Sequence, residues 1–416
     1  MVVYVVIILY YIKINMECKS CKRKNLTSIL DLGEHPWCND FLSKDRLGRE
    51  SYYPLHLMYC EDCKLLQLDY TVPKEVMFKN HTYVSSTTKT LTKHFYELAE
   101  ENKQQFNLKE DDLILDIGGN DGTQMLQYQK IGLRNVLNVE SADNIAQLSI
   151  GAGVNTINDF FNEELIENTN LVDKVKLINA SGVFFHLEEL HSVIRGIKKA
   201  LKDDGIFVVQ FMYAGTMVEK MSFDMIYHEH LIYYTLESLK YLLEPYGFTI
   251  FDAYYSEIHS GSVIAKISKS DTFTITQRCW KMMETDEKYQ KNQFIEFAEK
   301  IEKRRKNLKY FLQGIKTGNP NAKIYAYGAP AKGNTLLNYF NIDNTLIDKC
   351  VEINELKIGL HLPKSHIPIV RESEEDVPDY YLLLAHNFAD EIIEKNQKLI
   401  KNGVKFIVPF PEIRVV

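Results

Sequence analysis

A strand that runs directly into a glycine turn is the feature that most constrains this chain. The apolar run at residues 113–117 leads into the turn at residues 118–122, which holds three glycines, and a helical pattern follows over residues 124–131. Glycines let the backbone approach a ligand closely, and a helix amino terminus favours a carboxylate or phosphate. The segment therefore predicts a ligand-binding turn in an α/β domain.

Strands and helices alternate around this turn. Strands are expected at residues 112–117, 135–140, 175–179 and 205–211, and helices at residues 87–105, 124–131 and 187–201. Strands separated by helices of this length predict a doubly wound parallel sheet. A second α/β pattern runs from residues 323–327 through 346–351 and 380–385 to 404–408, behind a charged, solvated helix at 295–314. A chain of 416 residues is expected to form two or three domains.

Four of the seven cysteines form two close pairs in an otherwise turn-rich segment, residues 16–72. The pairs Cys18–Cys21 and Cys60–Cys63 each place two thiolates on one side of an ion, and zinc takes four ligands in a tetrahedron. Four thiolates leave no open coordination position, so a bound zinc is expected to be structural. The pairs also favour a reducing compartment over a disulfide framework, and Cys38 is expected to be an ordinary buried residue.

The residues of the glycine turn discriminate between two cofactors. A dinucleotide site calls for G-x-G-x-x-G, and Gly118, Gly119 and Gly122 do not follow that spacing. Asp116, which leads the turn, suits the amino group of a methionine moiety and would repel a pyrophosphate. Glu140 ends the next strand and suits ribose hydroxyls. The pattern favours S-adenosylmethionine over NAD.

Asp159 and Phe160 stand where an adenine clamp is expected, with a carboxylate for the exocyclic amine and an aromatic ring to stack. The alternative is that Phe160 and Phe161 belong to the core beside a surface aspartate.

A second polar cluster is the run Tyr227-His228-Glu229-His230. Two histidines four apart on a helix would predict zinc, but these are two apart. In an extended segment they would share one face, with Glu229 on the other. A neutral imidazole is a good base near neutral pH, so His230 and also His186 are candidates for catalysis. The alternative is a set of buried structural polar residues.

Several motifs, in order along the chain, together resemble one family. They are the cysteine pairs with residues 31–34 between them, and the segments 120–122, 227–230, 328–334 and 408–414. The pattern resembles the sugar C-methyltransferases of deoxysugar biosynthesis, which act on nucleotide-linked 4-keto-6-deoxy sugars. The resemblance implies a zinc-binding module at residues 16–80 and a Rossmann-like class I methyltransferase domain at 81–255. A second Rossmann-like α/β domain at 256–416 is expected to contribute to sugar-nucleotide binding.

The resemblance also implies roles for individual residues. His230 is the expected general base, with Tyr227 and Glu229 beside it and Tyr83 and His186 as further active-site groups. Gly328, Ala329, Lys332 and Asn334 form a second glycine turn expected to bind the nucleotide sugar, with dTDP the expected nucleotide. The expected cofactor-binding residues are Asp116, Gly118, Asn120, Asp121, Gly122, Glu140, Asp159 and Phe160, and the zinc ligands are Cys18, Cys21, Cys60 and Cys63.

Two other functions remain open at this point. One keeps the cofactor and methylates an oxygen or nitrogen of a sugar nucleotide; the other is a non-catalytic zinc-ribbon interaction protein.

A net charge of −7 with no polybasic tail argues against nucleic-acid binding. The apolar start, residues 1–15, is shorter than a membrane span and is interpreted as an extension of uncertain role or an upstream start codon, with a membrane anchor or signal sequence as the alternative. We expect a cytoplasmic enzyme with no membrane partner, present as a monomer or weak dimer.

Overall fold

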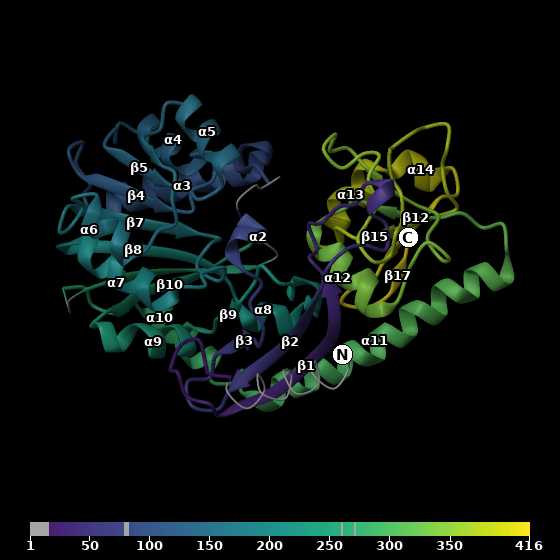
Figure 1. Ribbon diagram of the computed structural model, residues 1–416, viewed down its shortest axis with the longest axis horizontal. Helices are drawn as coiled ribbons and strands as arrows, with labels where there is room; N and C mark the ends of the chain where they lie inside the picture. The colour runs from purple at the N-terminus through teal and green to yellow at the C-terminus, as the bar shows by residue number, and fades with distance from the viewer. Residues whose placement is uncertain (1–15, 79–82, 259–260, 270–271) are drawn as a thin grey trace.

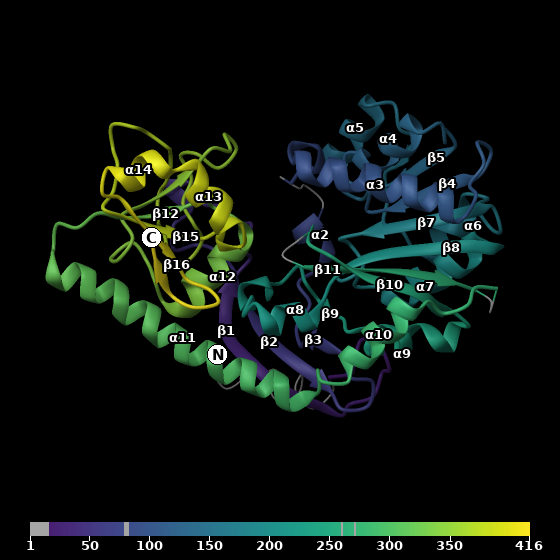
Figure 2. The same cartoon turned by 180° about the vertical axis from the view of Figure 1, so that it is seen from behind.

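The computed structural model describes residues 16–416 apart from residues 79–82, 259–260 and 270–271. The interpretation of residues 1–15 therefore falls outside the described residues, as do His81 and Thr82 beside Tyr83. Two lobes lie side by side and are joined along one edge by the long strands β1 and β2 and by helix α11 (Figure 1; Figure 2). None of the helices in the described part is long and apolar enough to cross a membrane.

The lobe that carries the first glycine turn is built on a sheet with the strand order β10-β11-β8-β7-β4-β5-β6. The strands are β4 (Leu113–Ile117), β5 (Val136–Val139), β6 (Thr156–Ile157), β7 (Val175–Ser181), β8 (Leu201–Met212), β10 (Thr249–Ser256) and β11 (Ser262–Ser268). Strands β8 to β6 are parallel, and the β10–β11 hairpin adds antiparallel to β8. The doubly wound sheet predicted from sequence is confirmed, with strand limits within a few residues of those expected.

Both faces of this sheet are covered by helices. Helices α3 (Lys89–Gln105) and α4 (Thr123–Lys130) pack on one face, where α3 buries the predicted stripe Leu91, Phe95, Leu98 and Ala99. Helix α7 (Leu190–Ala200) covers the other face. Neighbouring residues of β4 therefore enter different cores: Ile114 packs with α3 and α4, and Leu115 packs with α7.

The second lobe repeats this arrangement on a smaller scale. Its sheet has the order β14-β13-β12-β15-β16-β17, parallel except for β17. The strands are β12 (Ile324–Tyr327), β13 (Lys349–Glu352), β14 (Ile369–Arg371), β15 (Tyr380–Leu383), β16 (Lys405–Val408) and β17 (Arg414–Val415), and helix α12 is Ala331–Phe340. Helix α11 (Lys291–Gly318) buries Phe294, Ile301 and Leu308 and leaves most of its charges toward solvent, as expected for a solvated charged helix.

The amino-terminal segment differs from the turn-rich prediction. It forms β1 (Leu26–Pro36) and β2 (Tyr52–Cys60), which pair antiparallel over nearly their whole length, with β3 (Leu66–Leu68) beside them. The prediction was wrong because register shifts after Ser28 and after Asp31 interrupt the alternation of apolar and polar residues by which a strand is recognised. A strand from the middle of the chain, β9 (Ile232–Tyr233), completes this sheet by pairing with β3. The predicted domain limits thus stay predictions, since β9 and α11 each join parts that lie far apart in sequence.

Candidate active site

The two cysteine pairs form one cluster with the geometry of a zinc site. The Sγ atoms of Cys18, Cys21, Cys60 and Cys63 all lie within 4.8 Å of one another. A tetrahedral Zn–S distance of about 2.3 Å places sulfurs about 3.8 Å apart, so the cluster fits the ion. Each pair is a tight turn closed by a lysine with left-handed backbone, Lys22 or Lys64, whose N–H donates to the carbonyl of the first cysteine. The backbone is thus preformed for metal on both sides, while Cys38 is buried outside the cluster, as predicted.

The first glycine turn lies at the carboxyl end of β4, beside β7, where the strand order of the sheet reverses. Ligands of doubly wound sheets bind at this position. A Cβ on Gly118 would lie 2.6 Å from Val183 Cγ2, in the loop after β7, so only glycine lets the turn pack against that loop. Gly118 and Gly122 also have left-handed backbone.

Asp116 is a buried residue near the end of β4. Its side chain is 1% exposed, and among the described residues its Oδ1 has no hydrogen-bond partner. Burial and the nearby Glu140 carboxylate raise the pKa of Asp116 well above its usual range. A buried carboxyl with an unused oxygen is suited to a cation, and the predicted contact with the ammonium group of S-adenosylmethionine stays a prediction.

Glu140 holds the turn from the other side. Its Oε2 accepts from the Asn120 N–H at 2.9 Å and its Oε1 from the Ala142 N–H at 2.8 Å. The carboxylate is therefore fixed at the end of β5, where ribose hydroxyls are expected.

Asn120 and Asp121, predicted to bind the cofactor, bond to another segment of the protein. The Asn120 side chain accepts from the Ser85 N–H and donates to the Tyr83 carbonyl, and Asp121 Oδ2 accepts from the Ser86 N–H. The pair thus fixes the segment that carries Tyr83 beside the turn. Asp159 is exposed, while Phe160 is half-buried with the Lys74 ammonium 4.4 Å from its ring centre, so their role as an adenine clamp stays a prediction.

The predicted catalytic residues gather in a cluster of rings. The His230 ring centre lies 3.8 Å from that of Tyr227, 4.7 Å from Phe185 and 5.1 Å from His186. His230 Nδ1 is 2.7 Å from the Met225 carbonyl, and His186 Nδ1 is 2.6 Å from the Glu229 carbonyl. A carbonyl only accepts, so both Nδ1 atoms carry hydrogen, and in the neutral form of each ring the lone pair is on Nε2.

The shared face expected for His228 and His230 is wrong. Residues 227–230 form a turn closed by the His230 N–H and the Tyr227 carbonyl, and not an extended strand. His228 consequently points away, with its ring 5.8 Å from Tyr53 and its Nε2 3.3 Å from the Tyr53 carbonyl. It is a buried structural residue outside the His230 cluster.

Glu229 is held by the amino-terminal module. Its Oε1 accepts from the Trp37 indole N–H and from the Asn39 amide, both at 2.6 Å. These donors precede Glu229 by about 190 residues, and no local pattern in the sequence marks them. The loop that carries them is tied in turn to the second lobe, because the Asn334 amide donates to the Cys38 carbonyl.

The second glycine turn repeats the geometry of the first. The Gly328 N–H donates to the Val351 carbonyl at 2.9 Å, as Gly118 does to Val139, and Glu352 accepts from the Ala329 N–H at 2.8 Å, as Glu140 does from Asn120. Glu352 was missed in the sequence, although an acidic residue that ends the next strand is the signal by which Glu140 was found. A pocket of about 370 Å³ opens at this turn, lined among others by Gly328, Ala329 and Glu352.

Lys332 and Asn334 face away from that pocket toward neighbouring segments. Lys332 Nζ donates to the Asn387 side chain, and burial lowers its pKa while Asp224 opposes this change. Asn334 anchors the Cys38 loop, as described above. Of the four residues predicted to bind substrate, Gly328 and Ala329 line the pocket and the other two support its surroundings.

Comparisons with known proteins cover nearly the whole chain. A model described as the C-methyltransferase C-terminal domain matches residues 257–411, a zinc binding domain model matches residues 18–78, and a methyltransferase domain model matches residues 91–253. The chain is 30% identical over 408 residues to the C-methyltransferase NovU of Streptomyces niveus, with 96% of each chain covered. The chain belongs to this C-methyltransferase family. The enzyme uses S-adenosylmethionine, and its four-cysteine module is the zinc-binding domain.

Several solved structures resemble part of the chain. They include the PH0226 protein of Pyrococcus horikoshii OT3, at 12% identity over 47% of this chain and 97% of that chain with a TM-score of 0.35. Another is a geranyl diphosphate C-methyltransferase from Streptomyces coelicolor A3(2), at 12% identity over 44% and 80% with a TM-score of 0.34.

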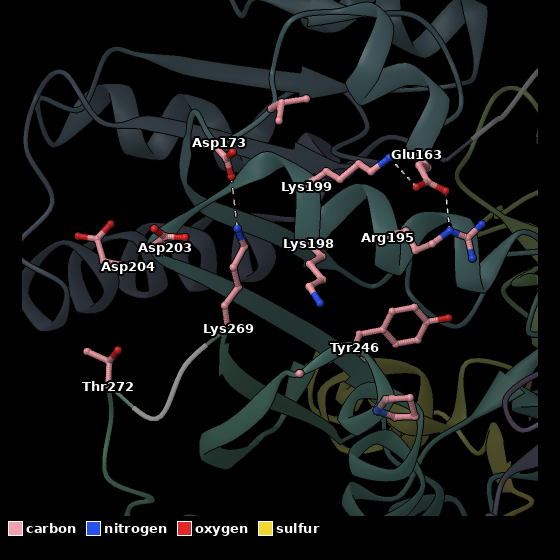
Figure 3. Close-up of a pocket in the computed structure, with 13 residues that line it drawn as sticks. Glu163, Asp173, Arg195, Lys198, Lys199, Asp203, Asp204, Tyr246, Lys269 and Thr272 are labelled. Atoms are coloured by element: carbon pink, nitrogen blue, oxygen red, sulfur yellow. Dashed lines mark hydrogen bonds and ion pairs between the residues drawn. The ribbon is translucent and has the colours of Figure 1, made fainter.

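A larger cavity of this C-methyltransferase, about 890 Å³, holds none of the predicted site residues (Figure 3). Its charges largely pair with one another: Arg195 and Lys199 with Glu163, and Lys269 with Asp173. Self-paired surface charges of this kind have no evident chemistry, so the candidate site stays at the two glycine turns and the His230 cluster.

Proposed function

We propose that this C-methyltransferase methylates the carbon next to the ketone of a nucleotide-linked 4-keto-6-deoxy sugar, with His230 as the general base. The observation that carries the proposal is the environment of His230. His230 is 3% exposed, and its Nδ1–H donates to the Met225 carbonyl with an Nδ1···O distance of 2.7 Å. The lone pair on Nε2 is the acceptor that proton abstraction from carbon requires.

The neighbouring groups are suited to the oxyanion of an enolate. Burial and the Glu229 carboxylate raise the pKa of Tyr227 well above its ordinary value, so its hydroxyl keeps its proton. A protonated phenol beside the base can donate to the oxygen on which negative charge develops. His186 and Tyr83 are further candidates for this contact; the Tyr83 segment is tied to the cofactor turn through Asn120.

The second glycine turn is the proposed binding site for the nucleotide of the substrate, in the second lobe. Its backbone and the Glu352 carboxylate repeat the parts by which the first turn is expected to hold an adenosyl group, and a pocket of about 370 Å³ opens beside them. The exposed apolar side chain of Ile353 lines this pocket and offers surface to a base. If a nucleotide binds here, the sugar attached to it would extend toward the His230 cluster. The nucleotide that we expect is dTDP.

The proposed reaction divides between the cofactor and the protein. S-adenosylmethionine supplies an electrophilic methyl group. His230 Nε2 takes the proton from the carbon next to the ketone, Tyr227 donates to the enolate oxygen, and the two lobes hold that carbon in line with the methyl group. Such a biosynthetic step fits our expectation of a cytoplasmic monomer or weak dimer.

Proton exchange separates the base from the rest of the site. The enzyme, saturated with S-adenosylhomocysteine, is incubated in deuterium oxide with a panel of 4-keto-6-deoxy nucleotide sugars, and deuterium uptake is followed by mass spectrometry. A parallel incubation with S-adenosylmethionine reports transfer of a methyl group and whether carbon, oxygen or nitrogen receives it.

We expect His230→Gln to lower exchange by about 100-fold or more while leaving cofactor affinity unchanged. His191→Gln is the matched control, because His191 lies on α7 and bonds Tyr246 and the Lys19 carbonyl, away from the cluster. Undiminished exchange in His230→Gln would assign the base to another residue, and methyl transfer to oxygen or nitrogen would contradict the proposed reaction.

A further inference from the structure

A short segment of the methyltransferase lobe touches both the second lobe and the proposed base. It begins with the 3-10 helix η3 (Phe223–Met225) and continues through the turn that ends at His230. Asp224 and Met225 are adjacent in this segment but contact different parts of the molecule. Asp224 faces the second lobe, and the Met225 carbonyl accepts from His230 Nδ1.

The contact across the lobes is a buried hydrogen bond between Asp224 and His386. His386 Nε2 lies 2.7 Å from Asp224 Oδ2, and their side chains are 5% and 0% exposed. Burial opposes ionisation of Asp224, but His386 and Lys332 together hold the pKa of that carboxyl below its usual value. His386 begins the 3-10 helix η6 (His386–Phe388), separated by two residues from the end of β15, in the loop that faces the second glycine turn.

Aromatic packing fixes the same segment against the second lobe. Phe223 stacks on Phe340 with ring centres 5.0 Å apart and 3° between the planes, and its ring lies 5.5 Å from Phe410. The packing holds the segment against the second lobe, while the Asp224–His386 bond is directional and fixes the Asp224 side chain, one residue before the carbonyl of Met225.

We infer that Asp224 and His386 are positioning residues that couple the placement of the second lobe to the orientation of the His230 imidazole through the Met225 carbonyl. A shift of the His386 loop moves Asp224, and the next carbonyl along the chain moves with it. The carbonyl selects the tautomer and direction of His230. The inference rests on the proposed function, because a coupled base is useful only if His230 is the base. The coupling implies that proton abstraction by His230 is most efficient when the second glycine turn, beside His386, is in the position that it takes with a nucleotide bound.

Histidine NMR tests the coupling without any substrate. Protein labelled with 15N-histidine is compared with His230→Gln, whose missing signal identifies the Nδ1–H resonance of His230. We expect His386→Ala and Asp224→Asn each to shift or broaden that resonance. His386→Gln keeps an N–H donor within reach of Asp224 and is expected to restore it.

His366→Ala is the matched control. His366 Nε2 lies 2.7 Å from the buried Glu50 carboxylate and also links the second lobe to another part of the chain, but it does not contact the segment 223–230. It is expected to leave the His230 resonance unchanged. An unchanged resonance in both His386→Ala and Asp224→Asn would overturn the inference.

Kinetics then relate the coupling to turnover. We expect His386→Ala to lower kcat and deuterium exchange by about 100-fold, the loss typical of a misplaced catalytic group, with little change in KM or cofactor affinity. His386→Gln should recover most of kcat. A rise in KM with unchanged kcat would mean that His386 only binds substrate, and would overturn the coupling. If the resonance moves but wild-type enzyme exchanges no sugar of the panel, the coupling stands and the assignment of His230 as the base fails.

Discussion

At the scale of single residues, Asp116 is placed where its own charge is unfavourable. It is buried, its Oδ1 has no partner among the described residues, and Glu140 adds a second negative charge nearby. A carboxyl whose pKa is raised by folding stabilises the protein at low pH, and this contribution is lost as pH rises through the raised pKa. At neutral pH the cofactor-free protein therefore bears a cost that a bound cation removes.

We predict opposite effects of Asp116→Asn on stability and on binding. The variant removes the unfavourable charge, so the melting temperature of the cofactor-free protein at pH 7.5 should rise. Affinity for S-adenosylmethionine should fall by about tenfold or more, since a paired buried charge contributes on the order of 1.4 kcal/mol or more. Thermal denaturation and titration calorimetry measure the two effects. Asp111→Asn, at an exposed position before β4, should change neither, and unaltered affinity in Asp116→Asn would exclude an ammonium contact.

Trp37 lies in the amino-terminal module but acts at Glu229. Trp37→Phe keeps a ring and removes the N–H donor, so Glu229 loses one charge-assisted hydrogen bond. We predict a fall in kcat of about tenfold, because such a bond is worth about 1.5–3 kcal/mol and Glu229 borders the base. Cofactor affinity should be unchanged. The chain has one other tryptophan, the half-exposed Trp280, and Trp280→Phe should leave kcat within about twofold.

At the scale of elements, the two zinc knuckles lie together at one end of the amino-terminal sheet, where Leu26 of β1 pairs with Cys60 of β2. Cys60 ends β2, and Cys18 and Cys21 lie on the chain just before β1, so metal removal releases both strands. The loop between β1 and β2 carries Trp37 and Asn39 to Glu229. Loss of zinc is therefore expected to act on the site from a distance.

We predict that a strong chelator, or Cys21→Ser, removes the metal, reduces β-sheet circular dichroism and abolishes turnover. Binding of S-adenosylmethionine should persist, because the first glycine turn rests on the other sheet. Metal analysis and calorimetry on the same samples decide this. Cys279→Ser, at a buried cysteine outside the cluster, should keep its zinc; full turnover after zinc loss would show that the module has no part in the site.

At the scale of the whole molecule, the site depends on how the two lobes are held together. Phe223 packs on Phe340 and Phe410 across the interface, while Phe106 packs on Phe251 and Phe273 inside one lobe. The two phenylalanines are similar in burial and in aromatic packing, but only Phe223 lies between the lobes.

We predict that Phe223→Ala and Phe106→Ala each destabilise the protein by about 3–5 kcal/mol, the usual cost of a deleted core ring. Only Phe223→Ala should lower kcat at temperatures where both variants are folded. Urea denaturation gives the free energies of unfolding, and steady-state kinetics gives kcat. Equal losses of kcat in the two variants would show that general stability, and not lobe placement, limits turnover.

The sequence alone was sufficient for the features that depend on local pattern. The strands and helices of both α/β lobes follow from apolar runs and periodicity, the zinc ligands from paired cysteine spacing, and the first glycine turn from residues 116–122. These signals are carried by residues within one or two turns of each other. Where the pattern was interrupted, as at the register shifts of β1, prediction failed.

Tertiary structure alone decided which residues meet. Trp37 and Asn39 reach Glu229, His386 reaches Asp224, and Asn334 reaches the Cys38 carbonyl across separations of 162 to 296 residues. The turn at residues 227–230, which separates His228 from His230, likewise depends on packing that no local propensity encodes. Each contact is one hydrogen bond between groups that are brought together by the burial of other residues. The local sequence around either residue therefore does not identify its hydrogen-bond partner. The residue types in the sequence were therefore enough to predict the chemistry of the site. Its geometry depends on how the two lobes and the zinc-binding sheet pack together.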